Sequence, residues 1–113
     1  MSKDAISAAS DLERVAVDVP EWGGEVSLQV PSVADFEAWN VSRIGEDGEF
    51  VSIGARASLV ALCLVDDGGA RMFSDSEIES LAQKSWKVID RLFEQCKQLA
   101  GVDDAEVEET EKN

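Results

Sequence analysis

The chain has 113 residues, 44% of them hydrophobic, with two cysteines, no histidine and a formal net charge of -14 at pH 7. This length fits one domain that buries roughly two thirds of its unfolded surface. The negative charge argues against nucleic acid and anionic membranes as partners, because both attract Lys and Arg. Without histidine, zinc sites, serine hydrolysis and acid–base catalysis lose their commonest residue, so we expect neither an enzyme nor a bound metal or cofactor.

The N-terminal part predicts a loose lead-in followed by a β-hairpin. Residues Met1–Leu12 are small and polar, and they lack the apolar core of a signal peptide. Within residues 14–30, valine or leucine alternates with other side chains in two runs, which the turn Pro20–Gly24 separates. This period of two is typical of a hairpin with one apolar face. Because a lone hairpin is only marginally stable in water, we expect that face to pack on helices.

Two helices are predicted in the middle of the chain. Ser32 is a typical N-cap, with Asp35 in a weaker form of the capping box, and it opens a helix over about residues 32–44. The most apolar stretch, residues 51–65, is longer than most strands and contains no run of charged side chains. We expect it to form a buried central helix.

The C-terminal half predicts two further helices. Ser74 and Glu77 form the sequence pattern of a capping box at the start of a short helix over about residues 75–82. Residues 86–100 place apolar side chains at helical spacing, and Gly101 is a typical residue to end a helix.

The last stretch, residues 102–113, is acidic and poor in apolar side chains, which predicts a disordered, flexible tail. The sequence therefore predicts a mainly helical α+β fold. Residues 1–101 are expected to form a single domain in which the N-terminal β-hairpin packs on about four helices, and the acidic tail follows it.

No stretch carries the pattern of a catalytic or metal site. Asp66–Gly69 begins with two carboxylates, but the later oxygen ligands of a calcium loop are missing, so a tight turn is the simpler interpretation. The glycine motifs that bind phosphates do not occur. Cys63 and Cys96 lie in apolar helical runs, which predicts buried free thiols.

The candidate partner-binding residues are the tryptophans and one arginine. Trp22 lies at the predicted hairpin tip, where its indole either folds onto the helices or contacts a partner. Trp39 and Trp86 lie on apolar helix faces and are either core residues or interface anchors. Arg56, inside the apolar stretch, either pairs with a carboxylate or reaches the surface as a contact.

Several stretches resemble the tail assembly chaperones of long-tailed bacteriophages and prophages. The resemblance covers about Val15–Gly101 and consists of packing and turn patterns without a catalytic signature. The stretches that carry it are Val19–Gly24, Ala55–Asp66, Arg71–Asp75 and Leu92–Phe93.

This resemblance implies a function before tail tube polymerisation. Such a chaperone binds the long, hydrophobic tape measure protein, keeps it soluble, and helps to recruit tail tube subunits. It acts in the host cell cytoplasm and is absent from the finished virion. Many members also have a longer form made by a programmed ribosomal frameshift, and an A-rich slippery run encoding Glu111–Asn113 would fit that arrangement.

Two other interpretations remain open at this point. The charge of -14 also suits a phage-encoded inhibitor that mimics DNA, although many of its acidic residues lie in the tail. The broad apolar last helix could equally pair with a second copy of the chain, so self-association is a further hypothesis.

Overall fold

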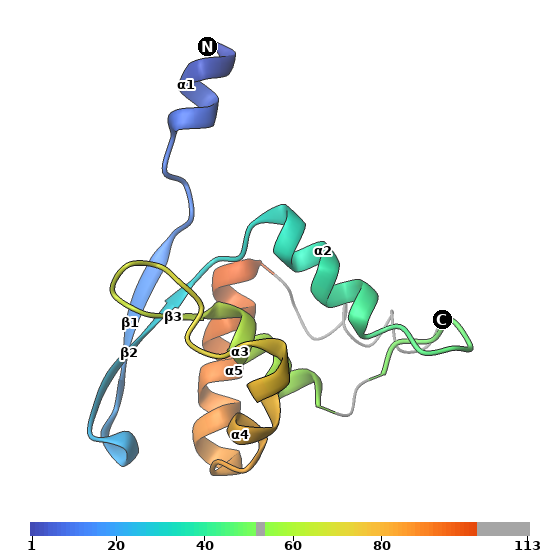
Figure 1. Cartoon of the computed structure of the whole chain (residues 1–113). Coiled ribbons are helices and arrows are strands. Elements are labelled where there is room, and N and C mark those ends of the chain that lie inside the picture. The colour runs from blue at the N-terminus through green and yellow to red at the C-terminus, as the bar shows by residue number, and fades with distance from the viewer. Residues whose placement is uncertain (52–53, 102–113) are drawn as a thin grey trace.

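The computed structural model describes residues 1–51 and 54–101, which form helices around a small antiparallel sheet (Figure 1). The predicted acidic tail lies outside the described residues. The elements in chain order are α1 (Lys3–Ala8), β1 (Arg14–Val19), the 3-10 turn η1 (Pro20–Trp22), β2 (Gly24–Gln29), α2 (Val33–Ser42), α3 (Ala55–Cys63), β3 (Leu64–Val65), the 3-10 turn η2 (Asp75–Glu77), α4 (Ile78–Ala82) and α5 (Trp86–Ala100). The predicted fold class, mainly helical α+β with an N-terminal hairpin, is confirmed.

The sheet has three strands in the order β1-β2-β3. In the hairpin, Val17 lies opposite Val26, and η1 forms the connection, with Gly23 in the left-handed conformation at φ 85°. Leu28 of β2 then pairs with Leu64 of β3. The valine and leucine face of the sheet packs on the core, with Val19 and Leu28 buried and Val15, Val17 and Val26 partly buried.

The predicted helix over residues 51–65 was too long at both ends, since α3 spans only Ala55–Cys63. Gly54 precedes it with φ 81°, a conformation that favours glycine and interrupts a helix. At the other end, Leu64 and Val65 pair with β2 instead of continuing the helix. An apolar run cannot by itself show where a buried helix gives way to a buried strand.

The interpretation of residues Met1–Leu12 as a loose lead-in is also corrected, because α1 forms within them. The Ser2 hydroxyl accepts a hydrogen bond from the Ala5 backbone N–H at 3.1 Å and so caps the helix. None of its residues is buried, and α1 stands apart from the other helices in Figure 1. The Ser2 cap and the helix-favouring alanines therefore stabilise α1, and packing against the rest of the chain does not.

The core lies where α3 meets α5 and the sheet. All residues of α3 except Arg56 are buried, as expected for a central helix. From α5, Val88, Leu92 and Cys96 are at most 1% exposed and pack against it. Gly101, with φ 73°, ends α5 as the sequence predicted.

The two cysteines meet in this core as free, buried thiols, which confirms the prediction. A hydrogen bond with Cys63, together with burial, raises the pKa of the Cys96 thiol well above its usual range. Cys96 therefore stays protonated at physiological pH.

Candidate functional site

Trp86 is the most exposed of the predicted aromatic anchors. It is the first residue of α5 and is 62% exposed. The guanidinium of Arg56 lies over its ring, 4.9 Å from the centroid, and also 5.2 Å from the centroid of Phe93. An arginine over an indole is a favourable cation–π arrangement. It limits how freely the indole can move while leaving most of its surface open.

A carboxylate on the next turn of α5 holds Arg56 in this place. Nε of Arg56 lies 3.4 Å from Oδ1 of Asp90, and both side chains are partly open to water. A pair this exposed contributes on the order of 0–1 kcal/mol to stability. Its effect is therefore mainly to orient the guanidinium over Trp86. Arg56 thus pairs with a carboxylate while remaining exposed, and its contact with a partner stays a prediction.

A hollow of 260 Å³ adjoins this indole. Its walls come from α3, α4 and the start of α5, and they combine small apolar side chains with the cations of Arg56 and Lys84. The lining residues are Gly54, Arg56, Ala57, Ala82, Lys84, Trp86 and Ile89. The chain has a net charge of -14, but this hollow is lined by two cations and lies beside an exposed indole. It therefore fits a partner segment that places an apolar side chain next to an acidic one.

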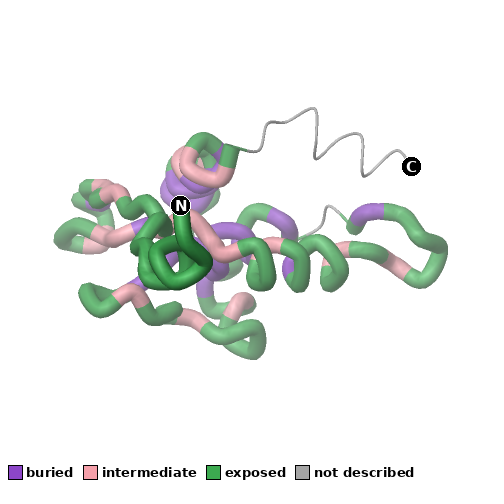
Figure 2. The backbone as a smooth tube through the Cα atoms, turned by 90° about the horizontal axis from the view of Figure 1, so that it is seen from above, coloured by how far each residue is buried: buried purple, intermediate pink, exposed green. Residues whose placement is uncertain are grey.

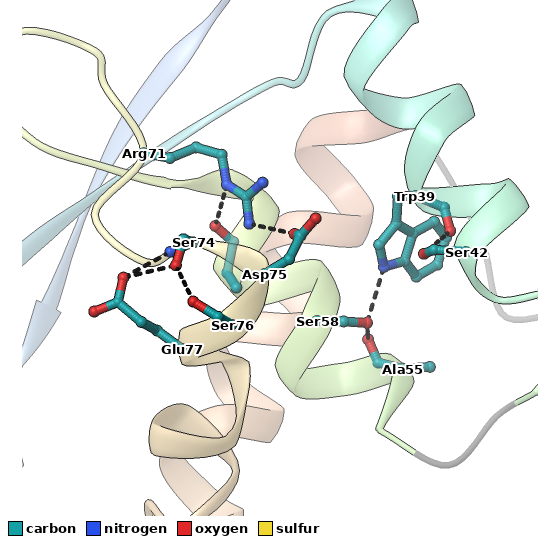
Figure 3. Close-up of polar contacts among 10 residues, drawn as sticks. Trp39, Ser42, Ala55, Ser58, Arg71, Ser74, Asp75, Ser76 and Glu77 are labelled. Carbon is teal, nitrogen blue, oxygen red and sulfur yellow. Dashed lines mark hydrogen bonds and ion pairs between the residues drawn. The ribbon is translucent and has the colours of Figure 1, made fainter.

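Trp39 lies in the core, and only 8% of it is exposed. Its indole Nε1 donates a hydrogen bond to Oγ of Ser58 at 2.9 Å, and that hydroxyl donates to the Ala55 carbonyl at 3.0 Å (Figure 3). The rings of Phe36 and Phe50 flank it at 5.7 and 5.9 Å between centroids. Trp39 thus joins α2 to α3 and is a core residue in the described fold.

Trp22 is half-buried and packs against the core at the hairpin tip. Its neighbour Glu21 forms a two-pronged ion pair with Arg91 of α5, at 2.8 and 3.1 Å. The hydrogen bond with Arg91 lowers the pKa of Glu21 below its usual range. This pair fixes the tip on α5 and leaves part of the Trp22 ring accessible.

A larger cavity of 390 Å³ lies between α2, α3 and the start of η2. Arg71 spans one side: its Nε donates to the Ala61 carbonyl at 3.3 Å, and its Nη2 contacts Asp75 at 3.2 Å (Figure 3). Next to it, Ser74 and Glu77 form the predicted capping box. The polar side chains of Arg71, Ser74, Asp75 and Glu77 all have partners within the chain, so structure accounts for them.

The features of metal and membrane sites concern residues 1–51 and 54–101, the ranges that the structure describes. Within these ranges no group of three or more His, Cys, Asp or Glu residues could hold a metal ion. The carboxylate of Asp66 instead accepts from the backbone N–H groups of Gly68 and Ala70 at 2.9 and 3.0 Å, the predicted tight turn. None of the helices described is long and apolar enough to cross a bilayer.

The sequence patterns missed two parts of this surface. Lys84 lines the hollow beside Trp86, but it lies between two helices, where no periodicity marks it. The Glu21–Arg91 pair joins residues 70 positions apart, and a single sequence carries no signal for such a contact.

Comparison with known proteins agrees with this architecture. The family model described as "Phage tail assembly chaperone" matches residues 2–113, which is more of the chain than the motifs alone indicated. Among solved structures, the tail assembly chaperone of bacteriophage HK97 superposes with a TM-score of 0.62 at 25% identity, covering 89% of this chain and 95% of that one. No curated protein matches in sequence. The chain therefore belongs to the phage tail assembly chaperone family.

Proposed function

We propose that this chain binds the tape measure protein, keeps it soluble, and helps to recruit tail tube subunits before the tube polymerises. Family membership supports the setting in tail assembly. The single observation that carries a binding role is Trp86, a large apolar side chain that is 62% exposed and oriented by Arg56. Oriented, exposed aromatic residues are frequent anchors of protein interfaces.

The proposed mechanism is capture of a helical client segment. An apolar client side chain would enter the hollow beside Trp86, where Arg56 and Lys84 favour a neighbouring acidic residue. The strong net charge of -14 would keep the complex dispersed through mutual repulsion. Trp22 is a secondary anchor, since part of its ring is accessible.

The place and the partners of this activity belong to the same proposal. The chaperone would act in the host cell cytoplasm and leave before the virion is complete. A longer, frameshifted form would supply the contact with the tail tube protein. The alternative of a DNA mimic requires acidic groups across a folded face, whereas the exposed Trp86 is bordered by the cations of Arg56 and Lys84.

Co-expression with the tape measure protein of the same genome tests the proposal. The tape measure protein should be insoluble alone and should co-purify with this chain as a soluble complex in size exclusion. Failure of the wild-type chain to co-purify with it would overturn the proposal.

A variant series then tests the anchor. Trp86→Ala should reduce the recovered complex about tenfold or more, as expected for an interface hot spot. Met72→Ala is the matched control, because Met72 is also a large apolar side chain and 53% exposed. Equal recovery with Trp86→Ala and wild type would show that the client binds elsewhere.

A further inference from the structure

Helix α2 carries apolar side chains around much of its circumference and buries only some of them. Successive residues of a helix are rotated by about 100°, so Glu37 and Val41 lie away from Phe36 and Trp39, whereas Val33, three residues before Phe36, lies at the edge between the two sides. Phe36 and Trp39 face α3 and the core. Val33 and Val41, in contrast, are 74% and 73% exposed.

The outward side of α2 is an apolar stripe that one carboxylate interrupts. Ala34 and Ala38 lie between the two valines along the helix and are also exposed, Ala38 at the edge toward the cavity beside Trp39, and Glu37 is the charged residue within the stripe. In Figure 2 most of the tube along α2 has the colour of exposed residues. This arrangement leaves one side of α2 without a partner in the described part of the chain.

We propose that this stripe docks an amphipathic helix of the client, with a Lys or Arg of that helix opposite Glu37. This stripe consists of Val33, Ala34, Glu37, Ala38 and Val41. The proposal rests on the proposed function and adds a second contact surface to it. The small side chains of the two alanines allow a partner helix to approach closely, and the valines fill the spaces between its side chains.

Charge determines the kind of helix that fits. Glu37 lies midway between Val33 and Val41, so it would be covered when a partner helix docks. A carboxylate that loses water requires a cationic partner. The nearby chain adds further negative charge, at Asp35, Glu46, Asp47 and Glu49. A basic amphipathic helix is therefore the complementary partner.

The same charges disfavour a second copy of this chain as the occupant. In a symmetric pair of antiparallel helices, the middle of each stripe lies near the two-fold axis. The two Glu37 carboxylates would then face each other without a cation between them. Each copy also carries a net charge of -14, which adds repulsion at longer range.

A groove extends the stripe beyond the start of α2. It has a volume of 390 Å³ and lies between the segment Val30–Ser32, the first turns of α2 and the end of α5. Val33, Phe36 and Glu37 line it from α2, and Ala100 and Gly101 line it at the end of α5. A large apolar side chain near one end of the docked helix could enter this groove.

The test uses two synthetic peptides of 18 residues as probes, measured by fluorescence anisotropy with the full chain. Both carry a helical leucine stripe on an alanine and glutamine background, and one has lysines beside the stripe where the other has glutamates. The lysine peptide should bind the wild-type chain at least about tenfold more tightly. The double variant Val33→Gln/Val41→Gln should weaken this binding about tenfold or more.

Charge reversal supplies the sharpest readout. Glu37→Lys should reverse the preference, so that the glutamate peptide binds more tightly than the lysine peptide. Glu37→Gln should remove the preference, and Ser80→Lys, a charge change at an exposed site on α4, should leave it unaltered. Unchanged binding and preference in the α2 variants would overturn the proposal.

Co-expression with the tape measure protein separates this inference from the proposed function. Recovery of the complex that falls with Trp86→Ala but not with Val33→Gln/Val41→Gln would overturn the α2 site and leave the function intact. Lysine-peptide binding at α2 without any recovery of tape measure protein would support the site and overturn the function. If the free chain is a dimer and Val41→Glu converts it to a monomer, a second copy occupies the stripe. That result would overturn the client helix as its occupant.

Discussion

Helices α2 and α5 differ in how much of their apolar surface the chain itself covers. Along α5, Val88, Ile89 and Leu92 are buried and most of the opposite side is charged or polar. Along α2, Trp39 is buried, but the valines on the opposite side are not. Apart from the exposed Trp86 at its start, the sequence of α5 is explained by the fold of one chain, and that of α2 is explained only in part. The difference indicates that the outer side of α2 is available for a partner in addition to Trp86.

The largest expected effect on the free energy of unfolding comes from a core residue of α5. Leu92 is fully buried, so Leu92→Ala should lower the free energy of unfolding by about 2–5 kcal/mol through lost contacts and a cavity. Urea denaturation followed by tryptophan fluorescence measures it, with the exposed Gln98→Ala as control. A loss below about 1 kcal/mol would mean that α5 is not the main core helix.

The next effect concerns the buried side of α2. Ser58→Ala would leave the Trp39 indole N–H buried without its acceptor, at a cost of about 1–3 kcal/mol. The same substitution in a Trp39→Phe background should cost less, because no donor is then left unpaired. Equal costs in the two backgrounds, measured by urea denaturation, would mean that this hydrogen bond does not join α2 to α3.

The smallest effect on stability is expected on the outer side of α2. Val33→Gln/Val41→Gln changes exposed side chains, so the free energy of unfolding should shift by no more than about 0.5 kcal/mol per site. Thermal and urea denaturation of the free chain check this value. A loss comparable to that of Leu92→Ala would show that the chain itself covers these valines in solution, and the contrast between the two helices would then disappear.

Sequence patterns predicted the parts of the fold that depend on local chemistry. Alternating valines gave the hairpin, and Ser74 with Glu77 gave the capping box, because periodicity and caps act over a few residues. The strand β3 was missed since its pairing with β2 is a tertiary contact that an apolar run does not reveal. Helix α1 was missed because it is only six residues long and buries none of them, so it carries no periodic core face.

The candidate site was less predictable than the fold. The sequence identified Trp86 and Arg56 separately but not their stacking, which depends on how α3 lies beside α5. It could not separate Trp39, which lies in the core, from Trp86, which is exposed, because both occupy apolar helix faces. The exposed stripe of α2 was also missed, since Val33 and Val41 resemble core residues until the packing is known.

The protonated state of Cys96 has a consequence for redox chemistry. Only a thiolate attacks disulfides or reacts readily with oxidants. With the pKa of Cys96 raised and both sulfurs buried, the folded chain should exchange very slowly with glutathione. Because both thiols are buried, they should become reactive only when the core opens.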